Sequence, residues 1–262
     1  MTEKLALVWP EVWLFITTCV VMVVGLSPDL RVRRLCGWIS AIGIVIAIGA
    51  AVPVEHAVGL FPAITPYAKA MIGVVGLLLL PLLAGTVDRD LDAAIVSGGA
   101  GFSALRSNRA EFYAFFLFSL MGLMLTASAD DLIWLFLALE LTSLPTYIMV
   151  TISTRGTRSQ EAGVKYFFLG ALGAAIFLYG FALIYGATGT TDLSEIAGAF
   201  KAQGDAGGLN PIGVAGVAMA LVGLCLLPLA LGYQAYMAYQ AYQGQWREVP
   251  MLTDFARGQQ WI

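Results

Sequence analysis

The sequence predicts an all-α integral membrane protein, a polytopic bundle of about seven transmembrane helices. Of its 262 residues, 59% are hydrophobic and only 12% are charged, a balance that ordinary soluble domains do not have. Charge-poor stretches recur along the chain, each close to the roughly 20 residues that cross a hydrocarbon core. Because backbone groups in lipid must form hydrogen bonds within the protein, such stretches fold as helices.

The expected helices follow the charge-poor stretches in order. They cover residues 10–27, 35–53, 67–86, 111–128, 131–150, 162–187 and 211–231. The first stretch is followed by no small-residue cleavage site, so we expect it to stay as a membrane anchor. The connection Ala129–Asp131 is so short that the fourth and fifth helices must form an antiparallel hairpin. Asp130 and Asp131 are expected to cap the fifth helix, because helix amino termini favour negative side chains.

Basic residues are divided unevenly between the two sides of this topology. One side carries Lys4 and Lys201, whereas the other carries ten arginines. The positive-inside rule then places the amino terminus outside and the carboxyl terminus in the cytoplasm, in a cell inner (plasma) membrane. Lys69, at the outer mouth of the third span, is expected to be an interfacial anchor. The ten arginines are Arg31, Arg33, Arg34, Arg89, Arg106, Arg109, Arg155, Arg158, Arg247 and Arg257.

Glu140 is the most informative residue, because it places a carboxylate roughly 13 Å inside the fifth span, near the bilayer midplane. Such a group costs roughly 2.5–3.5 kcal/mol on insertion scales, and it usually faces a bundle interior or a wet cavity. Ser143 and Tyr147 follow on the same helix face. This polar stripe indicates a hydrated path for ions or protons, although a buried ion pair or an interhelical hydrogen bond would also explain Glu140. Pro145 removes a backbone donor and is expected to bend the helix.

Lys165 carries the opposite charge near the cytoplasmic end of the sixth span. Its ammonium group could turn inward towards Glu140, where the two charges would couple strongly in a low dielectric. Alternatively, its long side chain could extend to the interface and keep its charge in water. The sequence leaves both orientations open. Nearby, Glu161 and Arg158 are expected to form a solvated face.

Other classes of site find little support in the composition. No basic stretch is dense enough to indicate nucleic-acid binding. The three cysteines form no CxxC or zinc pattern, and a single histidine cannot build a histidine metal site. Small residues in the sixth span, including Gly170, Gly173 and Gly186, indicate close helix packing. We therefore expect this chain to bind no metal and no cofactor, so that any redox centres belong to partners.

Two longer runs resemble a known family. The first extends from Phe112 to Tyr147 and contains the phrase Leu-Glu-Leu-Thr-Ser-Leu-Pro-Thr-Tyr, and the second is Gln160–Ala171. Together they closely resemble the antiporter-like membrane subunits of respiratory complex I, and most of all subunit N of bacterial NADH-quinone oxidoreductase, the homologue of mitochondrial subunit 2. The resemblance covers roughly residues 5 to 225.

This resemblance implies a function and a set of partners. The family fold has fourteen spans in two inverted repeats, of which this chain would supply the first half. Glu140 and Lys165 match the family's proton pathway, with Ser143, Pro145 and Tyr147 as a supporting polar face. The chain would be a non-redox membrane-arm subunit of a proton-translocating NADH:quinone oxidoreductase. NADH, FMN, iron–sulfur clusters and quinone would then bind to partner subunits, and the quinone pool would be reached through the complex.

The sequence departs from the family pattern near Cys225. Leu226, Leu227 and Pro228 follow, where the family continues with a phenylalanine and a lysine, and a low-complexity stretch begins after Tyr233. We therefore divide the chain into a three-helix region (1–110), an incomplete first repeat (111–231) and an atypical tail (232–262). A truncated product is one expectation. The alternative functions are a structural or vestigial subunit, or a component of a multisubunit cation/proton antiporter or membrane hydrogenase.

Overall fold

The computed structural model describes residues 7–27, 29–51, 63–84, 107–152 and 157–242. These residues form helices joined by short turns and loops, with one isolated β-bridge. The helices are α2 (Trp9–Gly25), α3 (Leu30–Ala51), α4 (Thr65–Ala84), α6 (Arg109–Ala127), α7 (Leu132–Ile152), α8 (Thr157–Thr188), α9 (Leu193–Asp205) and α10 (Pro211–Tyr242).

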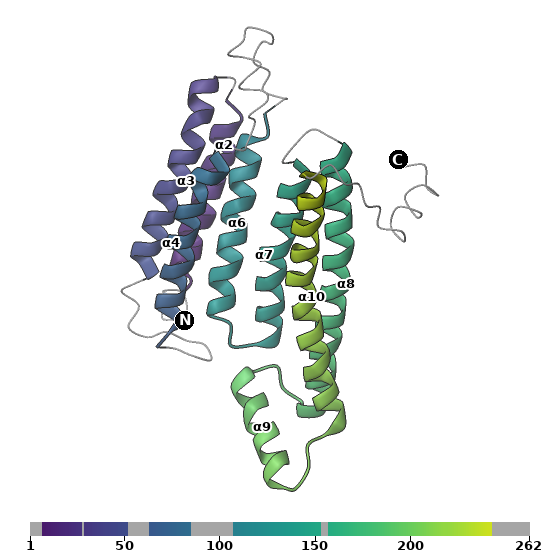
Figure 1. The fold of residues 1–262 in the computed structure, drawn as a ribbon. Coiled ribbons are helices and arrows are strands. Elements are labelled where there is room, and N and C mark those ends of the chain that lie inside the picture. Colours follow the sequence, from purple (N-terminus) through teal and green to yellow (C-terminus); the bar gives the residue numbers. More distant parts are fainter. Residues whose placement is uncertain (1–6, 28, 52–62, 85–106, 153–156, 243–262) are drawn as a thin grey trace.

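The seven expected spans are confirmed as helices. Five of them, α3, α4, α6, α7 and α8, are long and apolar enough to cross a membrane, and α2 and residues 211–226 of α10 are shorter apolar helices. The last helix continues past the expected end at residue 231 as far as Tyr242, so part of the low-complexity stretch is helical. The helices lie nearly parallel or antiparallel to one another, as a membrane bundle requires (Figure 1).

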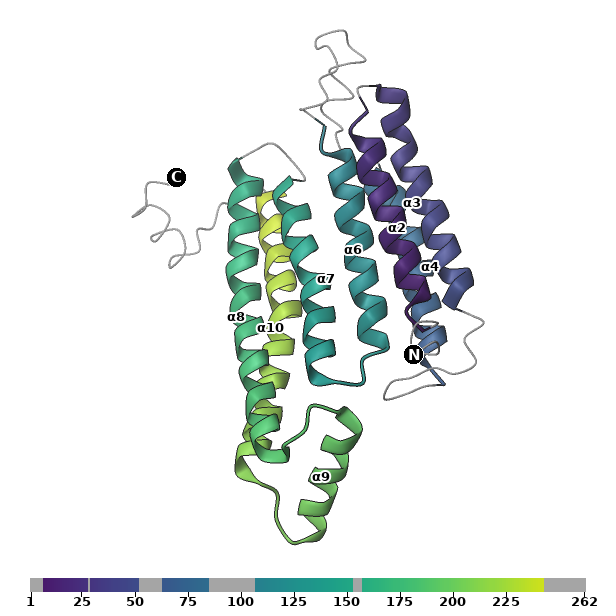
Figure 2. The ribbon, with the colours of Figure 1, turned by 180° about the vertical axis from the view of Figure 1, so that it is seen from behind.

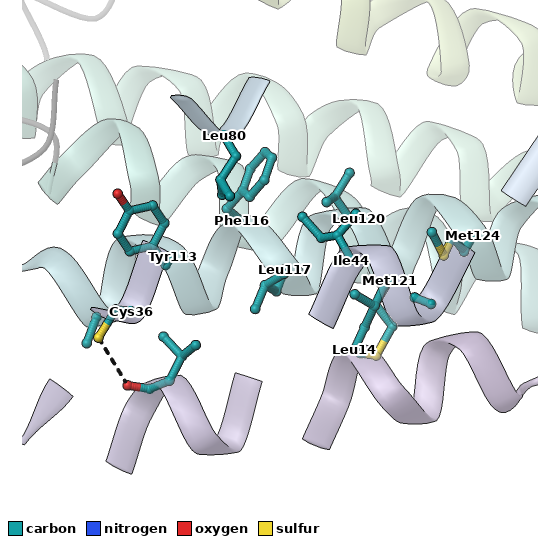
Figure 3. Packing of buried hydrophobic residues seen from close by; sticks show 13 residues of the cluster. Leu14, Cys36, Ile44, Leu80, Tyr113, Phe116, Leu117, Leu120, Met121 and Met124 are labelled. Atoms are coloured by element: carbon teal, nitrogen blue, oxygen red, sulfur yellow. Dashed lines mark hydrogen bonds between the residues drawn. The ribbon is translucent and has the colours of Figure 1, made fainter. Parts of the chain in front are cut away.

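The bundle has two neighbouring groups of helices, which meet where α6 packs against α7 (Figures 1 and 2). In the first group, α2, α3, α4 and α6 share one apolar core. Leu14 of α2, Ile44 of α3 and Leu117 of α6 are fully buried there (Figure 3). The thiol of Cys36 lies in the same core and donates a long hydrogen bond to the carbonyl of Val21, at 3.8 Å (Figure 3).

The second group contains α7, α8 and α10. Glycines bring the backbones of α8 and α10 into contact. A Cβ atom added to Gly180 would lie 2.5 Å from the backbone nitrogen of Ala220, and one added to Gly223 would lie 2.6 Å from that of Phe177. Close packing is therefore confirmed for Gly170 and Gly173, where a Cβ would also meet neighbouring atoms. It is not found at Gly186, whose Cβ would have nothing within 4 Å.

Helix α9 lies at the end of the bundle where α7 begins (Figure 1). It is a short helix that the charge-poor stretches do not predict. Its amino terminus is capped by Asp192, whose carboxylate accepts hydrogen bonds from the backbone of Ser194 (2.8 Å) and Glu195 (3.0 Å). The segment before it is tied to the start of α7, because Leu132 donates to Thr191 and Leu193 donates to Asp130, both at 2.9 Å.

The close approach of α8 and α10 generates the first prediction. Replacing Gly180 by alanine should lower the free energy of unfolding by about 1–3 kcal/mol, because the new methyl group meets backbone atoms rather than movable side chains. Gly186→Ala on the same helix is the matched control and should be neutral or stabilising by up to about 1 kcal/mol. Denaturant unfolding of the two variants in detergent measures the difference, and equal losses would contradict this packing.

Candidate functional site

Glu140 lies in the middle of α7, the ninth of the helix's 21 residues. Its side chain is partly buried, and most of its helix neighbours are apolar. Within the part of the chain that the structure describes, neither of the ion pairs found includes this carboxylate. A carboxylate at this depth without a cation is the unusual feature of the bundle, since intramembrane charges normally pair.

The polar stripe expected beside Glu140 is present. Ser143 and Tyr147 are both buried, Tyr147 to 5% exposure. They follow Glu140 by three and seven residues, on the same face of α7. The Ser143 hydroxyl also donates to the carbonyl of Leu139, at 3.0 Å. Pro145 lies inside α7, which continues beyond it to Ile152.

Helix α8 adds a residue that the sequence reasoning missed. Tyr166 is 3% exposed, and its ring packs edge-on against that of Tyr147 with 4.6 Å between ring centroids. Its hydroxyl lies 3.3 Å from the hydroxyl of Thr146 on α7. Tyr166 follows Lys165 directly, so a search for hydroxyls beside the charged residues would have pointed to it.

Gly170 of α8 leaves the space that the end of the Tyr147 side chain occupies. A Cβ atom at this position would lie 1.9 Å from the hydroxyl oxygen of Tyr147. The phenol of Tyr147 therefore reaches the α8 backbone at a point where only glycine leaves room. This close fit explains one of the small residues noted in the sixth span.

Lys165 is not paired with Glu140. Its ammonium group forms an ion pair with Glu161, one turn earlier on α8, and both side chains are partly exposed. The inward orientation towards Glu140 is thus not the one observed, because Glu161 holds the Lys165 ammonium in the amino-terminal third of α8. Glu161, expected on a solvated face with Arg158, is 28% exposed and contacts Lys165. Arg158 lies outside the residues whose side chains are described.

The structure contradicts the expectation for Lys69. The prediction of an interfacial anchor is wrong, because Lys69 is only 2% exposed. Its Nζ atom lies 2.6 Å from Oε1 of Glu11 on α2 and donates a hydrogen bond to the carbonyl of Leu7 at 2.7 Å. Helices α2 and α4 both begin at the same end of the bundle (Figure 1). A signal was present in the sequence, since opposite charges stand at similar depths in two spans that run in the same direction.

The expected cap of the fifth span is confirmed for Asp131, whereas Asp130 accepts a hydrogen bond from Leu193 through its backbone carbonyl. Oδ1 of Asp131 accepts hydrogen bonds from the backbone of Ile133 (2.7 Å) and Trp134 (3.3 Å). The hydroxyl of Thr191 donates to the other carboxylate oxygen. This hydrogen bond, reinforced by the two backbone donors, holds the pKa of Asp131 below its usual range. Asp131 therefore has a structural role at the end of the bundle.

The residues that the structure describes contain no group of three or more histidine, cysteine, aspartate or glutamate side chains that could hold a metal ion. The residues around Glu140 provide one carboxylate and several hydroxyls. Such a set can bind and pass protons.

The buried pair of Glu11 and Lys69 generates a stability prediction. Lys69→Met should lower the free energy of unfolding by about 3–5 kcal/mol, because it leaves the Glu11 carboxylate buried without a cation. Lys201→Met, at an exposed lysine of α9, is the control and should change little. The double variant Glu11→Leu/Lys69→Met should recover most of the loss. Thermal unfolding in detergent gives the comparison. A single variant as stable as the control would show that this ion pair does not hold α2 against α4.

Comparison with known proteins relates this chain to one family of membrane subunits. A family model described as "NADH:quinone oxidoreductase/Mrp antiporter, TM" matches residues 129–238. The chain is 32% identical over 217 residues to NADH-quinone oxidoreductase subunit N 2 of Koribacter versatilis, a match that covers 82% of this chain and 43% of the relative. It is 47% identical over 113 residues to subunit N of Myxococcus xanthus, which covers 40% of this chain and 22% of that relative.

Solved structures of two membrane complexes contain chains with a similar fold. A chain of respiratory complex I from Thermus thermophilus with bound aureothin superposes with a TM-score of 0.58 at 26% identity, over 82% of this chain and 43% of that one. The fold is also that of a chain in an archaeal membrane-bound sulfane sulfur reductase, with a TM-score of 0.57 and 22% identity. The chain spans less than half the length of the longer relatives it matches. It belongs to the family of antiporter-like membrane subunits that includes NADH-quinone oxidoreductase subunit N.

Proposed function

We propose that this chain is a membrane-arm subunit of a proton-translocating NADH-quinone oxidoreductase, and that Glu140 binds the translocated proton. The observation that carries the proposal is the place of Glu140, at mid-depth in a membrane helix without an ion-pair partner among the described residues. An intramembrane ionisable group of this kind marks ion pathways and proton relays. The family match supports it, because Glu140 lies inside the matched segment.

Lys165 belongs to the same pathway in this proposal. Its pair with Glu161 lies towards the amino-terminal end of α8, whereas Glu140 lies at mid-depth in α7. A proton that reaches Glu161 or Glu140 changes the local charge, and Lys165 can respond by changing partner. Coulomb coupling of this kind grows as the effective dielectric falls. Ser143, Pro145 and Tyr147 shape the polar face between the two ends.

The redox chemistry is assigned to other subunits. NADH, FMN, iron–sulfur clusters and quinone bind to the partners, and this chain takes part in the reaction as a non-redox subunit. Its relatives are more than twice as long as the part matched here, and a two-repeat pathway needs groups outside that part. Other membrane-arm subunits and the lipid bilayer are therefore its expected neighbours.

We place the protein in the cell inner membrane with the amino terminus outside. The placement is supported by the distribution of basic residues, because Arg31, Arg33 and Arg109 begin helices at one end of the bundle and Lys201 lies in α9 at the opposite end (Figure 1). The arginine-rich end would then face the cytoplasm.

A second candidate function is a component of a multisubunit cation/proton antiporter. It is favoured by the description of the matching family model, which names Mrp antiporters beside the quinone oxidoreductase. Gene neighbourhood separates the two candidates, since quinone-reductase genes and antiporter genes form different clusters. Dependence of transport on NADH oxidation separates them biochemically.

The proposal predicts the effect of removing the charge of Glu140. In the assembled complex, Glu140→Gln should strongly lower the number of protons pumped per NADH oxidised, because glutamine keeps the shape of the side chain but cannot take up a proton. Glu195→Gln on α9, an exposed carboxylate, is the control and should leave pumping unchanged. Proton movement and NADH oxidation are measured together in inverted membrane vesicles.

The contrary result would be an assembled complex that pumps normally with Glu140→Gln. If that variant changed stability or assembly but left pumping intact, the chain would be a structural subunit, and the translocation proposal would fail.

A further inference from the structure

We infer that the hydroxyls of Thr146, Tyr147 and Tyr166 form a proton relay between Glu140 and the end of the bundle that carries Lys165 and Glu161. The inference rests on the proposed function, which gives Glu140 a proton to bind. It adds residues on α8 and a direction to that function.

The first support is the geometry of the contact between α7 and α8. The hydroxyls of Thr146 and Tyr166 lie 3.3 Å apart, and the rings of Tyr147 and Tyr166 are in edge contact. Ser143 and Tyr147 follow Glu140 by three and seven residues on one face of α7. Polar groups of two helices are thus gathered near the face of α7 that carries Glu140, a carboxylate without an ion-pair partner among the described residues.

The second support is the cost of these hydroxyls. Burying a hydroxyl in an apolar environment costs about 1–3 kcal/mol on protein scales unless it is hydrogen-bonded. Phenylalanine would make the same ring contacts without that cost, as Phe167 does when its ring packs against Tyr147 with 5.9 Å between centroids. Packing therefore accounts for the rings at residues 147 and 166, and the hydroxyl at residue 166 is retained where it lies 3.3 Å from that of Thr146.

The third support is Gly170, which leaves room for the oxygen of Tyr147. A Cβ there would lie 1.9 Å from that oxygen, closer than any real contact. The outer ring carbons need the same space, because Cζ and Cε1 of Tyr147 would lie 2.4 Å and 2.9 Å from that Cβ. Helix α8 thus leaves room at this depth for the whole outer end of the Tyr147 phenol, including its oxygen.

The order of the groups along the helices gives the direction. On α7, Glu140 is followed by Ser143, Thr146 and Tyr147 on the way to the arginine-rich end. On α8, Tyr166 stands beside Lys165 in the chain, near that same end. Glu140 and Ser143 are three residues apart, a rise of about 4.5 Å along the helix, and in this relay a water molecule would carry the proton across that gap.

Each step of the relay conserves atoms. A hydroxyl oxygen accepts an incoming proton and releases its own proton to the next oxygen, so the side chain is unchanged after each passage. The final acceptor is the carboxylate of Glu140, which becomes a neutral carboxyl group. No electron is transferred, and no further reactant is needed.

The test compares tyrosine-to-phenylalanine variants in the assembled complex. Tyr147→Phe and Tyr166→Phe should each lower the protons pumped per NADH oxidised severalfold. The double variant should be no worse than the poorer single variant, because breaking a chain twice in series stops the same flow. Tyr179→Phe removes a phenol from the same helix at a position 56% exposed and should leave pumping unchanged. Gly170→Ala should reproduce the loss by displacing the hydroxyl of Tyr147.

Unchanged pumping in both single variants, or losses that add in the double variant, would overturn the relay. Where a tyrosine variant does not assemble, Thr146→Val breaks the bond to Tyr166 while leaving both rings in place, and its pumping decides the question. The two proposals fail separately. Normal pumping in Glu140→Gln removes the proposed function, whereas loss in Glu140→Gln with normal pumping in the hydroxyl variants removes the relay alone.

Discussion

Water is absent from the hydrocarbon core of a bilayer, and this constraint governs the rest of the structure. Backbone groups bond within helices, and polar side chains bond to the turn before them, as Thr142 does with the carbonyl of Ala138 at 3.0 Å. Charges must be paired and buried together, which Glu11 and Lys69 achieve at 2.6 Å. Among the described residues Glu140 has no ion-pair partner of this kind, and the proposed function gives a reason for a carboxylate at this depth.

Sequence reasoning predicted the features that depend on local signals. The positions of seven helices follow from long stretches without charge, since spanning the bilayer sets both their length and their composition. The cap at Asp131 and the stripe from Glu140 to Tyr147 follow from spacing along one helix, which fixes which residues share a face. In the structure Asp131 caps α7, and Ser143 and Tyr147 are both buried, as this spacing predicts.

Features that depend on neighbouring helices could not be predicted in the same way. Spacing gives the depth of Lys69 and Lys165 in the bilayer, but their partners depend on how whole helices pack. Lys69 meets a carboxylate on another helix, whereas Lys165 finds one on its own. Helix α9 was missed because its apolar residues are few. Asp192 followed three residues later by Glu195 is a helix-start pattern that would have indicated it.

The most direct test of the account is whether Glu140 changes its protonation during turnover. Infrared difference spectra of the assembled complex, recorded as NADH reduces quinone, report carboxyl groups that gain or lose a proton. The account predicts a carboxyl band that shifts in D2O and disappears in Glu140→Gln. Identical spectra from the native protein and this variant would show that Glu140 keeps one protonation state throughout, and would contradict its role as the proton-binding group.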